Sequence, residues 1–169
     1  WYLGNTLFVT SLSVSGVMIS SAMVAFGFAR LRFPQRDNLF IVVIATMMIP
    51  AQVTMIPTYI LFAKMGWTNS WLPLIVPAWF GGGAYNIFLL RQFFRTVPME
   101  LDEAAVLDGA SKLRIFWSII LPLARPAITV VGILSFMRHW NDFMGPLIYL
   151  TNRQLWTLAQ GVNGLKEFE

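Results

Sequence analysis

Cysteine is absent from this 169-residue sequence, and histidine occurs once, at His139. These absences exclude disulfide bonds, thiolate catalysis, cysteine metal sites and clusters of histidine ligands. The pattern Gly-x-x-x-x-Gly-Lys-Ser/Thr, whose backbone cradles nucleotide phosphates, does not occur either. Because no nucleophile, base or metal-binding residues converge in the sequence, we expect neither an enzyme nor a bound cofactor.

Charged residues are scarce and unevenly spaced. They make up 12% of the sequence, against 57% hydrophobic residues, and the mean hydropathy is +0.64. No charge occurs in three stretches that are each long enough to cross a bilayer, and a fourth apolar run contains Arg125 as its only charge. The sequence therefore predicts an all-α polytopic membrane helix bundle, a single transmembrane domain over residues 1–169. About four spans are expected, at residues 6–29, 39–61, 72–90 and 115–137.

The net charge of +4 does not indicate nucleic-acid binding, because the basic residues lie in short loops between apolar runs. One side of the expected topology holds Arg30, Arg32, Arg36, Arg91, Arg95, Lys112 and Arg114. The opposite short loop holds only Lys64. By the positive-inside rule the first side faces the cytoplasm, so the chain is expected to begin and end outside. Residues 138–169 then form an extracytoplasmic or re-entrant tail.

Proline and glycine predict irregular helices. Pro50 and Pro57 interrupt the second span, and the third contains Pro73, Pro77 and three consecutive glycines at positions 81–83. Such breaks often mark solute-lining or moving parts, and a simple kink is the alternative. The first span carries small residues at spacings that favour close helix packing, namely Ser11, Ser15, Gly16, Ser20, Ser21, Ala22 and Ala25.

The most informative stretch, residues 98–126, reads PMELDEAAVLDGASKLRIFWSIILPLARP. Pro98 suits the start of a short helix, and three acidic residues follow where the helix dipole is positive. Gly109 can adopt the left-handed conformation that ends this helix and turns the chain toward the next. From the residues alone, a cytoplasmic loop at 96–118 either docks its helix in a groove of another protein or lies on the membrane surface.

This stretch resembles the EAA loop of ABC importer permeases, whose pattern is Glu-Ala-Ala, three residues, Gly, nine residues and Ile-x-Leu-Pro. The sequence matches this pattern at Glu103, Ala104, Ala105, Gly109, Ile119, Leu121 and Pro122. The resemblance extends over most of the chain and looks closest to the carbohydrate-transporting branch, in the subunit similar to the second membrane subunit of the maltose transporter. Asp108 before Gly109 and the later cluster Trp140, Asn141, Asp142 and Phe143 support it.

The resemblance implies a multi-pass permease subunit in the inner or plasma membrane of a prokaryote. Its coupling helix, from Glu103 through Asp108 to Gly109, would enter a cleft of a cytoplasmic ABC ATPase dimer, and ATP would be used by that partner. A second permease subunit, identical or different, and an extracytoplasmic solute-binding protein facing the tail from Gln160 to Glu169 are also implied. Because full subunits of the family have further spans, we expect the first and last to lie outside this sequence.

The transported solute is expected to be a sugar or a related polar compound. Polar or aromatic residues at membrane depth are candidates for its path, namely Gln52, Thr54, Tyr59, Trp79, Tyr85 and Asn86. Hydrogen bonding between helices is the alternative role for each. The loop motif leaves open an ABC permease for amino acids or peptides. A channel or gradient-driven transporter would need no ATPase, and the third span lacks the acidic relay that would favour one.

Overall fold

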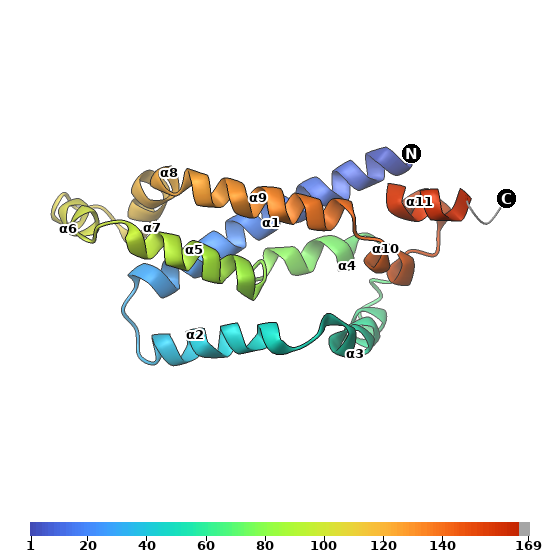
Figure 1. The fold of residues 1–169 in the computed structure, drawn as a ribbon, viewed down its shortest axis with the longest axis horizontal. Coiled ribbons are helices and arrows are strands. Elements are labelled where there is room, and N and C mark those ends of the chain that lie inside the picture. The colour runs from blue at the N-terminus through green and yellow to red at the C-terminus, as the bar shows by residue number, and fades with distance from the viewer. Residues whose placement is uncertain (166–169) are drawn as a thin grey trace.

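The computed structural model describes residues 1–165, and every regular element in this range is helical (Figure 1). The longer helices are α1 (Tyr2–Arg30), α2 (Arg36–Ala45), α3 (Ala51–Lys64), α5 (Ala84–Thr96), α6 (Glu100–Leu107), α9 (Arg125–Trp140) and α11 (Leu158–Leu165). The shorter elements are η1 (Thr46–Met48), α4 (Leu72–Ile75), η2 (Val76–Trp79), α7 (Lys112–Ile115), η3 (Phe116–Ile120, a π-helix), α8 (Leu121–Leu123), α10 (Met144–Tyr149) and η4 (Arg153–Leu155). The predicted all-α fold class is confirmed.

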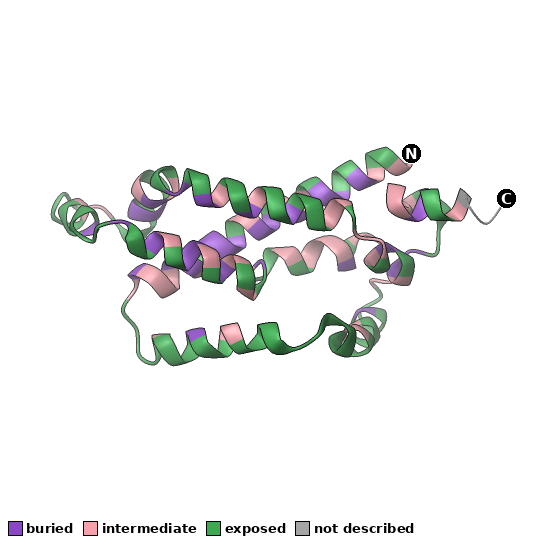
Figure 2. Ribbon diagram, viewed as in Figure 1, coloured by how far each residue is buried: buried purple, intermediate pink, exposed green. Residues whose placement is uncertain are grey.

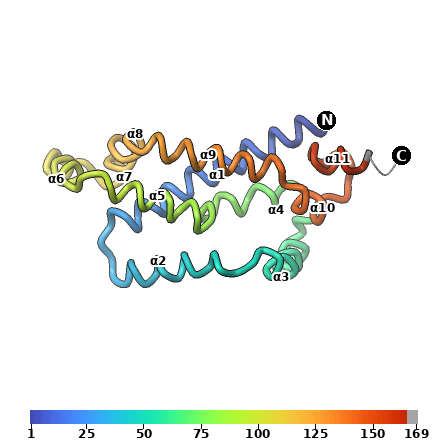
Figure 3. The backbone as a smooth tube through the Cα atoms, viewed as in Figure 1, coloured from blue at the N-terminus to red at the C-terminus, as the bar shows by residue number. Residues whose placement is uncertain are grey.

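Helix α1 forms the centre of the bundle. It packs along α5 and α9 and also contacts α4 and η2, as the path of the chain in Figure 3 shows. Its buried face consists largely of small residues, including Thr6, Thr10, Ser13, Gly16, Ser20, Ser21, Ala22 and Ala25. Figure 2 shows that α2 and α3 are exposed along most of their length. Close packing of the first span through small residues is thereby confirmed, although Ser11 and Ser15 are exposed.

Two stretches are long and apolar enough to cross a membrane, α1 and the stretch Leu72–Thr96. Two pairs of helices meet the same criteria only when joined, and each pair is sharply bent. Arg36–Met48 meets Ala51–Lys64 at 98°, and Lys112–Leu123 meets Arg125–Trp140 at 79°. The described residues thus hold two candidate spans, or four if each bent pair is one span, which is the number expected from the sequence.

The bend in the second candidate span lies at Pro50. This residue is extended, with φ −61° and ψ 137°, and it separates η1 from α3. Proline disfavours the helical conformation of the residue before it, so the first helix ends there. Pro57, the other predicted breaker, lies inside α3, which continues through it.

The fourth candidate span differs from the expected single helix over residues 115–137. The chain bends at Ala124, between Pro122 at the start of α8 and Pro126 at the start of α9. Neither proline can donate the backbone hydrogen bond that would carry a straight helix through this point. Helix α9 therefore runs along α1, while the segment before it is bent by 79° relative to α9.

The third candidate span is also irregular, as predicted, and α1 stabilises it. Its helix is interrupted after Trp79, so the last carbonyls of η2 have no partner within the helix. The Ser20 hydroxyl of α1 lies 3.0 Å from the Ala78 carbonyl oxygen, and Ser13 Oγ donates to the Leu74 carbonyl oxygen at 3.0 Å. Hydroxyl groups from a neighbouring helix thus satisfy backbone groups in a broken span.

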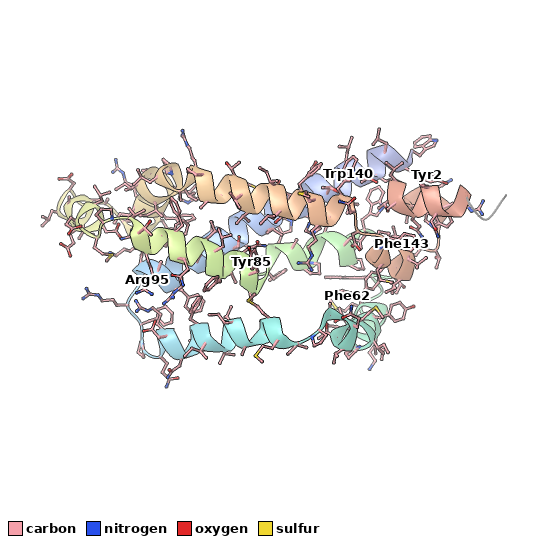
Figure 4. All side chains as sticks on the ribbon, viewed as in Figure 1. Tyr2, Phe62, Tyr85, Arg95, Trp140 and Phe143 are labelled. Atoms are coloured by element: carbon pink, nitrogen blue, oxygen red, sulfur yellow. The ribbon has the colours of Figure 1, made fainter. Side chains whose placement is uncertain are left out.

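The two ends of the bundle differ in chemistry. The basic end holds the C-terminal ends of α1 and α5, the start of α2, and α6 and α7 (Figure 1), and with them Arg30, Arg32, Arg36, Arg91, Arg95, Lys112 and Arg114. The aromatic end holds the start of α1 together with α3, α10 and α11. Figure 4 places Arg95 toward the basic end, and Tyr2, Phe62, Trp140 and Phe143 at the aromatic end.

The C-terminal segment folds back onto the start of α1. Asn5 Nδ2 donates a hydrogen bond to the Trp156 carbonyl oxygen at 2.9 Å. Gln160 is buried and donates from Nε2 to the Leu150 carbonyl oxygen at 3.2 Å. Gln160, expected to face an outside partner, therefore points into the protein. The tail continues in α11 to Leu165, and its last four positions, 166–169, lie outside the described residues.

Candidate functional site

The first half of the EAA-like loop forms the predicted short helix, α6. It begins after Pro98 and carries three acidic residues in its first turn. Gly109 has φ 81°, which confirms the predicted left-handed turn. Its backbone N–H donates to the Val106 carbonyl oxygen at 3.0 Å, and Ala110 N–H donates to the Ala105 carbonyl oxygen at 2.8 Å. The glycine thus closes the helix and reverses the chain.

The second half of the loop leads back to the bundle. Ser111 caps α7 by accepting a hydrogen bond from Arg114 N–H at 3.3 Å. The π-helix η3 and α8 follow, and within them Ile119 and Leu121 pack against the buried core. Pro122 is exposed at the bend. These last motif residues therefore anchor the loop to the bundle rather than extending its free surface.

Helix α6 projects from the basic end and exposes apolar side chains. Leu107 is 88% exposed, and Leu101 and Val106 are also exposed. Among the other motif residues, Glu103, Ala104 and Asp108 are exposed, whereas Ala105 packs against the core. A groove of about 850 Å³ separates α6 from the segment that follows α1, and its lining includes Arg32, Phe33, Glu103, Val106, Leu107 and Lys112.

Arg30, the last residue of α1, holds α6 to the bundle. Its Nη2 donates to the carbonyl oxygens of Phe94 and Val97, both at 2.7 Å. Its Nη1 lies 3.6 Å from Asp102 Oδ1 and 2.7 Å from Met99 Sδ. The side chains of Arg30 and Asp102 are only 1% and 5% exposed. We call Arg30, Phe94, Val97, Met99 and Asp102 the Arg30 cluster.

The sequence did not reveal the Arg30 cluster. The sequence indicates Arg30 only as one of the basic residues in short loops, and Asp102 only as one of three acids at a helix start. The only signals were a basic residue directly after an apolar run and an acidic residue in the first turn of α6. Arg30 instead belongs to α1, and both charged side chains are buried.

A second ion pair joins α5 to the start of α2. Arg91 Nη2 lies 3.2 Å from Asp37 Oδ1, and the Arg91 guanidinium lies 3.8 Å from the centre of the Phe40 ring. Arg91 Nε also donates to the Phe28 carbonyl oxygen at 3.3 Å. Arg91 is therefore buried among packing partners, although it was expected to be a loop residue.

The candidate solute-path residues fall into two groups. Gln52, Thr54 and Tyr59 lie on α3 at the aromatic end, whereas Trp79, Tyr85 and Asn86 flank the break between η2 and α5, about midway along the bundle (Figures 1 and 4). Among the described residues the six do not converge on one pocket. The lining of a common path by all six stays a prediction.

Several of these residues already have protein partners. Tyr59 stacks on Tyr149, with ring centres 5.9 Å apart. Asn86 Nδ2 donates to the Gly82 carbonyl oxygen at 2.7 Å. The Trp79 indole packs on Gly16 and remains 42% exposed on its other side.

Metal chemistry has no visible basis in the described part of the chain. Within it, no three His, Cys, Asp or Glu side chains lie close enough to hold a metal ion. His139 bonds through Nδ1 to the Ser135 carbonyl oxygen at 2.8 Å, which is an ordinary helix contact.

Comparisons with known proteins agree with this architecture. The chain is 38% identical over 161 residues to a putative ABC transporter permease protein, ORF2, of Caldicellulosiruptor sp. (strain Rt8B.4), covering 95% of the chain and 58% of that protein. It is 34% identical over 166 residues to the sn-glycerol-3-phosphate transport system permease protein UgpE of Salmonella typhi, covering 98% of the chain and 58% of that protein.

A solved structure has the same fold. A bacterial ABC transporter involved in the import of the acidic polysaccharide alginate contains a chain that matches with a TM-score of 0.86 and 26% identity, over 98% of this chain and 57% of that one. This sequence thus spans less than two thirds of the length of its relatives. The family described as binding-protein-dependent transport system inner membrane component matches residues 16–164. The chain therefore belongs to this family of inner-membrane transport components.

Proposed function

We propose that this chain belongs to the membrane-spanning permease subunit of an ABC importer, and that α6 is the helix through which a separate ATPase drives it. The observation that carries the proposal is the form of α6. A short helix with an exposed apolar tip, ended by a left-handed glycine, projects from the basic end of a membrane bundle. An 88% exposed leucine at such a tip suits insertion into a groove of another protein.

The individual motif residues have different proposed roles. Glu103, Ala104 and Asp108 contact the ATPase, because all three are exposed on α6. Ala105 lets α6 approach the bundle closely, and Gly109 provides the turn. Ile119, Leu121 and Pro122 fix the loop to the bend before α9, so that a movement of α6 reaches a membrane span.

The further partners follow from the exposed surfaces and the family. The exposed apolar faces of α2 and α3 meet lipid and a second permease subunit. An extracytoplasmic solute-binding protein delivers the solute at the aromatic end, and the solute is a sugar or a related polar compound. The relatives named for sn-glycerol-3-phosphate and for alginate support this class, since both of those solutes are rich in hydroxyl groups. The residues at the break of the third span, Trp79, Tyr85 and Asn86, are the first candidates for contact with it.

The proposal predicts that Gly109→Val and Glu103→Lys abolish uptake while the subunit still inserts in the membrane. A Cβ at Gly109 would meet no atom within 4 Å, so valine would cause no steric clash there. Only the positive φ of 81° disfavours it. That conformation costs a residue with a side chain about 1–2 kcal/mol and distorts the turn. The measurement is co-purification of the full subunit with candidate ATPases, together with uptake of maltose, sn-glycerol-3-phosphate and alginate oligosaccharides.

Gly66→Val is the matched control. Gly66 also has a positive φ, 70°, and open space around its Cβ position, but it follows α3 at the aromatic end. It should keep both the ATPase and uptake. Full uptake in the Gly109 and Glu103 variants would remove α6 from the mechanism, and uptake without any ATPase would show a gradient-driven carrier.

A further inference from the structure

Arg30 joins the ends of three helices with one side chain. The last carbonyls of a helix lack partners within it and favour a nearby cation, and Arg30 supplies that cation to the end of α5 through Phe94 and Val97. The same guanidinium faces Asp102 in the first turn of α6. Because Arg30 is the last residue of α1, the contacts connect α1, α5 and α6 at one point.

Burial makes this connection costly to break. Separating Arg30 from Asp102 would leave a nearly buried charge without compensation at the edge of the groove beside α6. The cluster can also tighten, because Arg30 Nε and Asp102 Oδ1 have no hydrogen-bond partner among the described residues. At 3.6 Å the attraction persists through a small shift of α6, so the pair pulls the ends of α1 and α5 in the same direction.

Two short backbone links join α6 to the rest of the chain. Only the short segment Val97–Met99 links α5 to α6, and Val97 is extended, with φ −72° and ψ 128°. On the other side α6 is followed by the glycine turn at Gly109. Beside these links, Ala105 packs against the core, and the Arg30 cluster supplies the polar connection between α6 and the ends of α1 and α5.

We propose that Arg30 is a positioning residue for energy coupling. Through Asp102, Phe94 and Val97 it fixes α6 to the ends of α1 and α5, so that a displacement of α6 moves these helices. The inference rests on the proposed function of α6 as the ATPase-coupling helix. It adds a role for two residues outside the EAA pattern, and it assigns the transmission of movement to α1 and α5 to a buried ion pair, beside the loop that leads to α9.

The test measures whether nucleotide binding at the ATPase still moves α1. The full subunit, free of other cysteines, carries Leu3→Cys, an exposed position on α1 that lies before the expected span at residues 6–29 and far from α6. In the assembled transporter, the rate of labelling by a membrane-impermeant maleimide is compared without nucleotide and after trapping with ATP, Mg²⁺ and vanadate. We expect trapping to change this rate in the parent by about fivefold or more.

Asp102→Asn should nearly abolish the effect of trapping on the labelling rate, because asparagine keeps the shape of the side chain but removes the charge that faces Arg30. The ATPase should stay bound to this variant. Asp102→Glu should retain more of the change than Asp102→Asn, whereas a packing role would favour the isosteric asparagine. Arg30→Lys should give a partial loss, since one ammonium group cannot match the guanidinium fork. Arg32→Lys is the control, an exposed neighbour that lines the same groove.

A parent-like response in Asp102→Asn, an equal or better response in asparagine than in glutamate, or loss of the ATPase from Asp102→Asn would each overturn the inference. If Gly109→Val abolishes the response while Asp102→Asn does not, the proposed function stands and only the role of Arg30 fails. If the parent binds no ATPase, the proposed function itself fails. A parent that binds the ATPase but shows no change on trapping would also refute movement of α1.

Discussion

Gly16 shows how closely α1 approaches the broken third span. A Cβ at this position would lie 2.6 Å from Trp79 Cδ1. We expect Gly16→Val to destabilise the full subunit by about 1–3 kcal/mol, the usual cost of overpacking a core. Thermal denaturation of the purified subunit measures this. Gly27→Val is the control, because Gly27 lies on the same helix and its Cβ would meet nothing within 4 Å.

The same contact allows a test of whether Trp79 has a packing role against α1. If the clash with Trp79 is the cause, Trp79→Ala should reduce the penalty of Gly16→Val. An unchanged penalty in the double variant would point to another cause.

Single residues also show which parts of the site could be predicted from the sequence. The left-handed conformation of Gly109 follows from residue type, because glycine adopts positive φ without a steric penalty. The start of α6 follows from a proline and several acids close together in the sequence. The Arg30 cluster could not be predicted this way. Its arginine reaches carbonyl groups 64 and 67 residues away, a relation that depends on how the helices pack.

At the scale of the element, hydroxyl groups on α1 stabilise irregular backbone on another helix. Ser20 lies within hydrogen-bonding distance of the Ala78 carbonyl oxygen on η2, at 3.0 Å, and of the Gly16 carbonyl oxygen on its own helix, at 2.7 Å. We expect Ser20→Ala to destabilise the subunit by about 1 kcal/mol, because the Ala78 carbonyl loses its donor. The measurement is again thermal denaturation of the purified subunit.

Ser15→Ala serves as the control for this prediction. Ser15 is exposed on the same helix, and among the described residues its hydroxyl bonds only within α1, to the Ser11 carbonyl oxygen at 2.8 Å. Such a bond adds little to the stability of a helix. An equal effect of the two substitutions would mean that the contact with η2 contributes nothing.

The sequence predicts the boundaries of helices that end at charged residues. It does not predict the boundaries that depend on how the helices pack. The first apolar run became α1 because it holds no charge and no proline before its basic end. Pro50 and Pro57 both lack a backbone N–H, so composition could not show that the chain bends at the first and continues through the second. Likewise, an apolar run over residues 115–137 reads as one span, and only the folded chain shows the 79° bend at Ala124.

The whole molecule is polarised along its length. Positions 30–36, 91–95 and 112–114 supply seven basic residues and are far apart in the sequence, yet they meet at the basic end because the spans alternate in direction. Tyr2, Phe62, Trp140 and Phe143 gather at the other end (Figure 4). Basic residues favour the cytoplasmic side of a membrane and aromatic side chains its interfaces, so this polarity supports the proposal that α6 docks on a cytoplasmic ATPase.

This polarity predicts opposite labelling of the two ends. Leu107, at the tip of α6, and Lys64, at the end of α3, are both exposed. The 169 residues contain no cysteine, so Leu107→Cys and Lys64→Cys each introduce a single one into them. With a membrane-impermeant maleimide, Lys64→Cys should react in intact cells, and Leu107→Cys only in inverted vesicles. Because the ATPase is proposed to cover α6, its addition to stripped vesicles should slow labelling of Leu107→Cys by about tenfold and leave Lys64→Cys unchanged. Reversed labelling would place the aromatic end in the cytoplasm, and an unprotected Leu107→Cys would leave the ATPase without its docking helix.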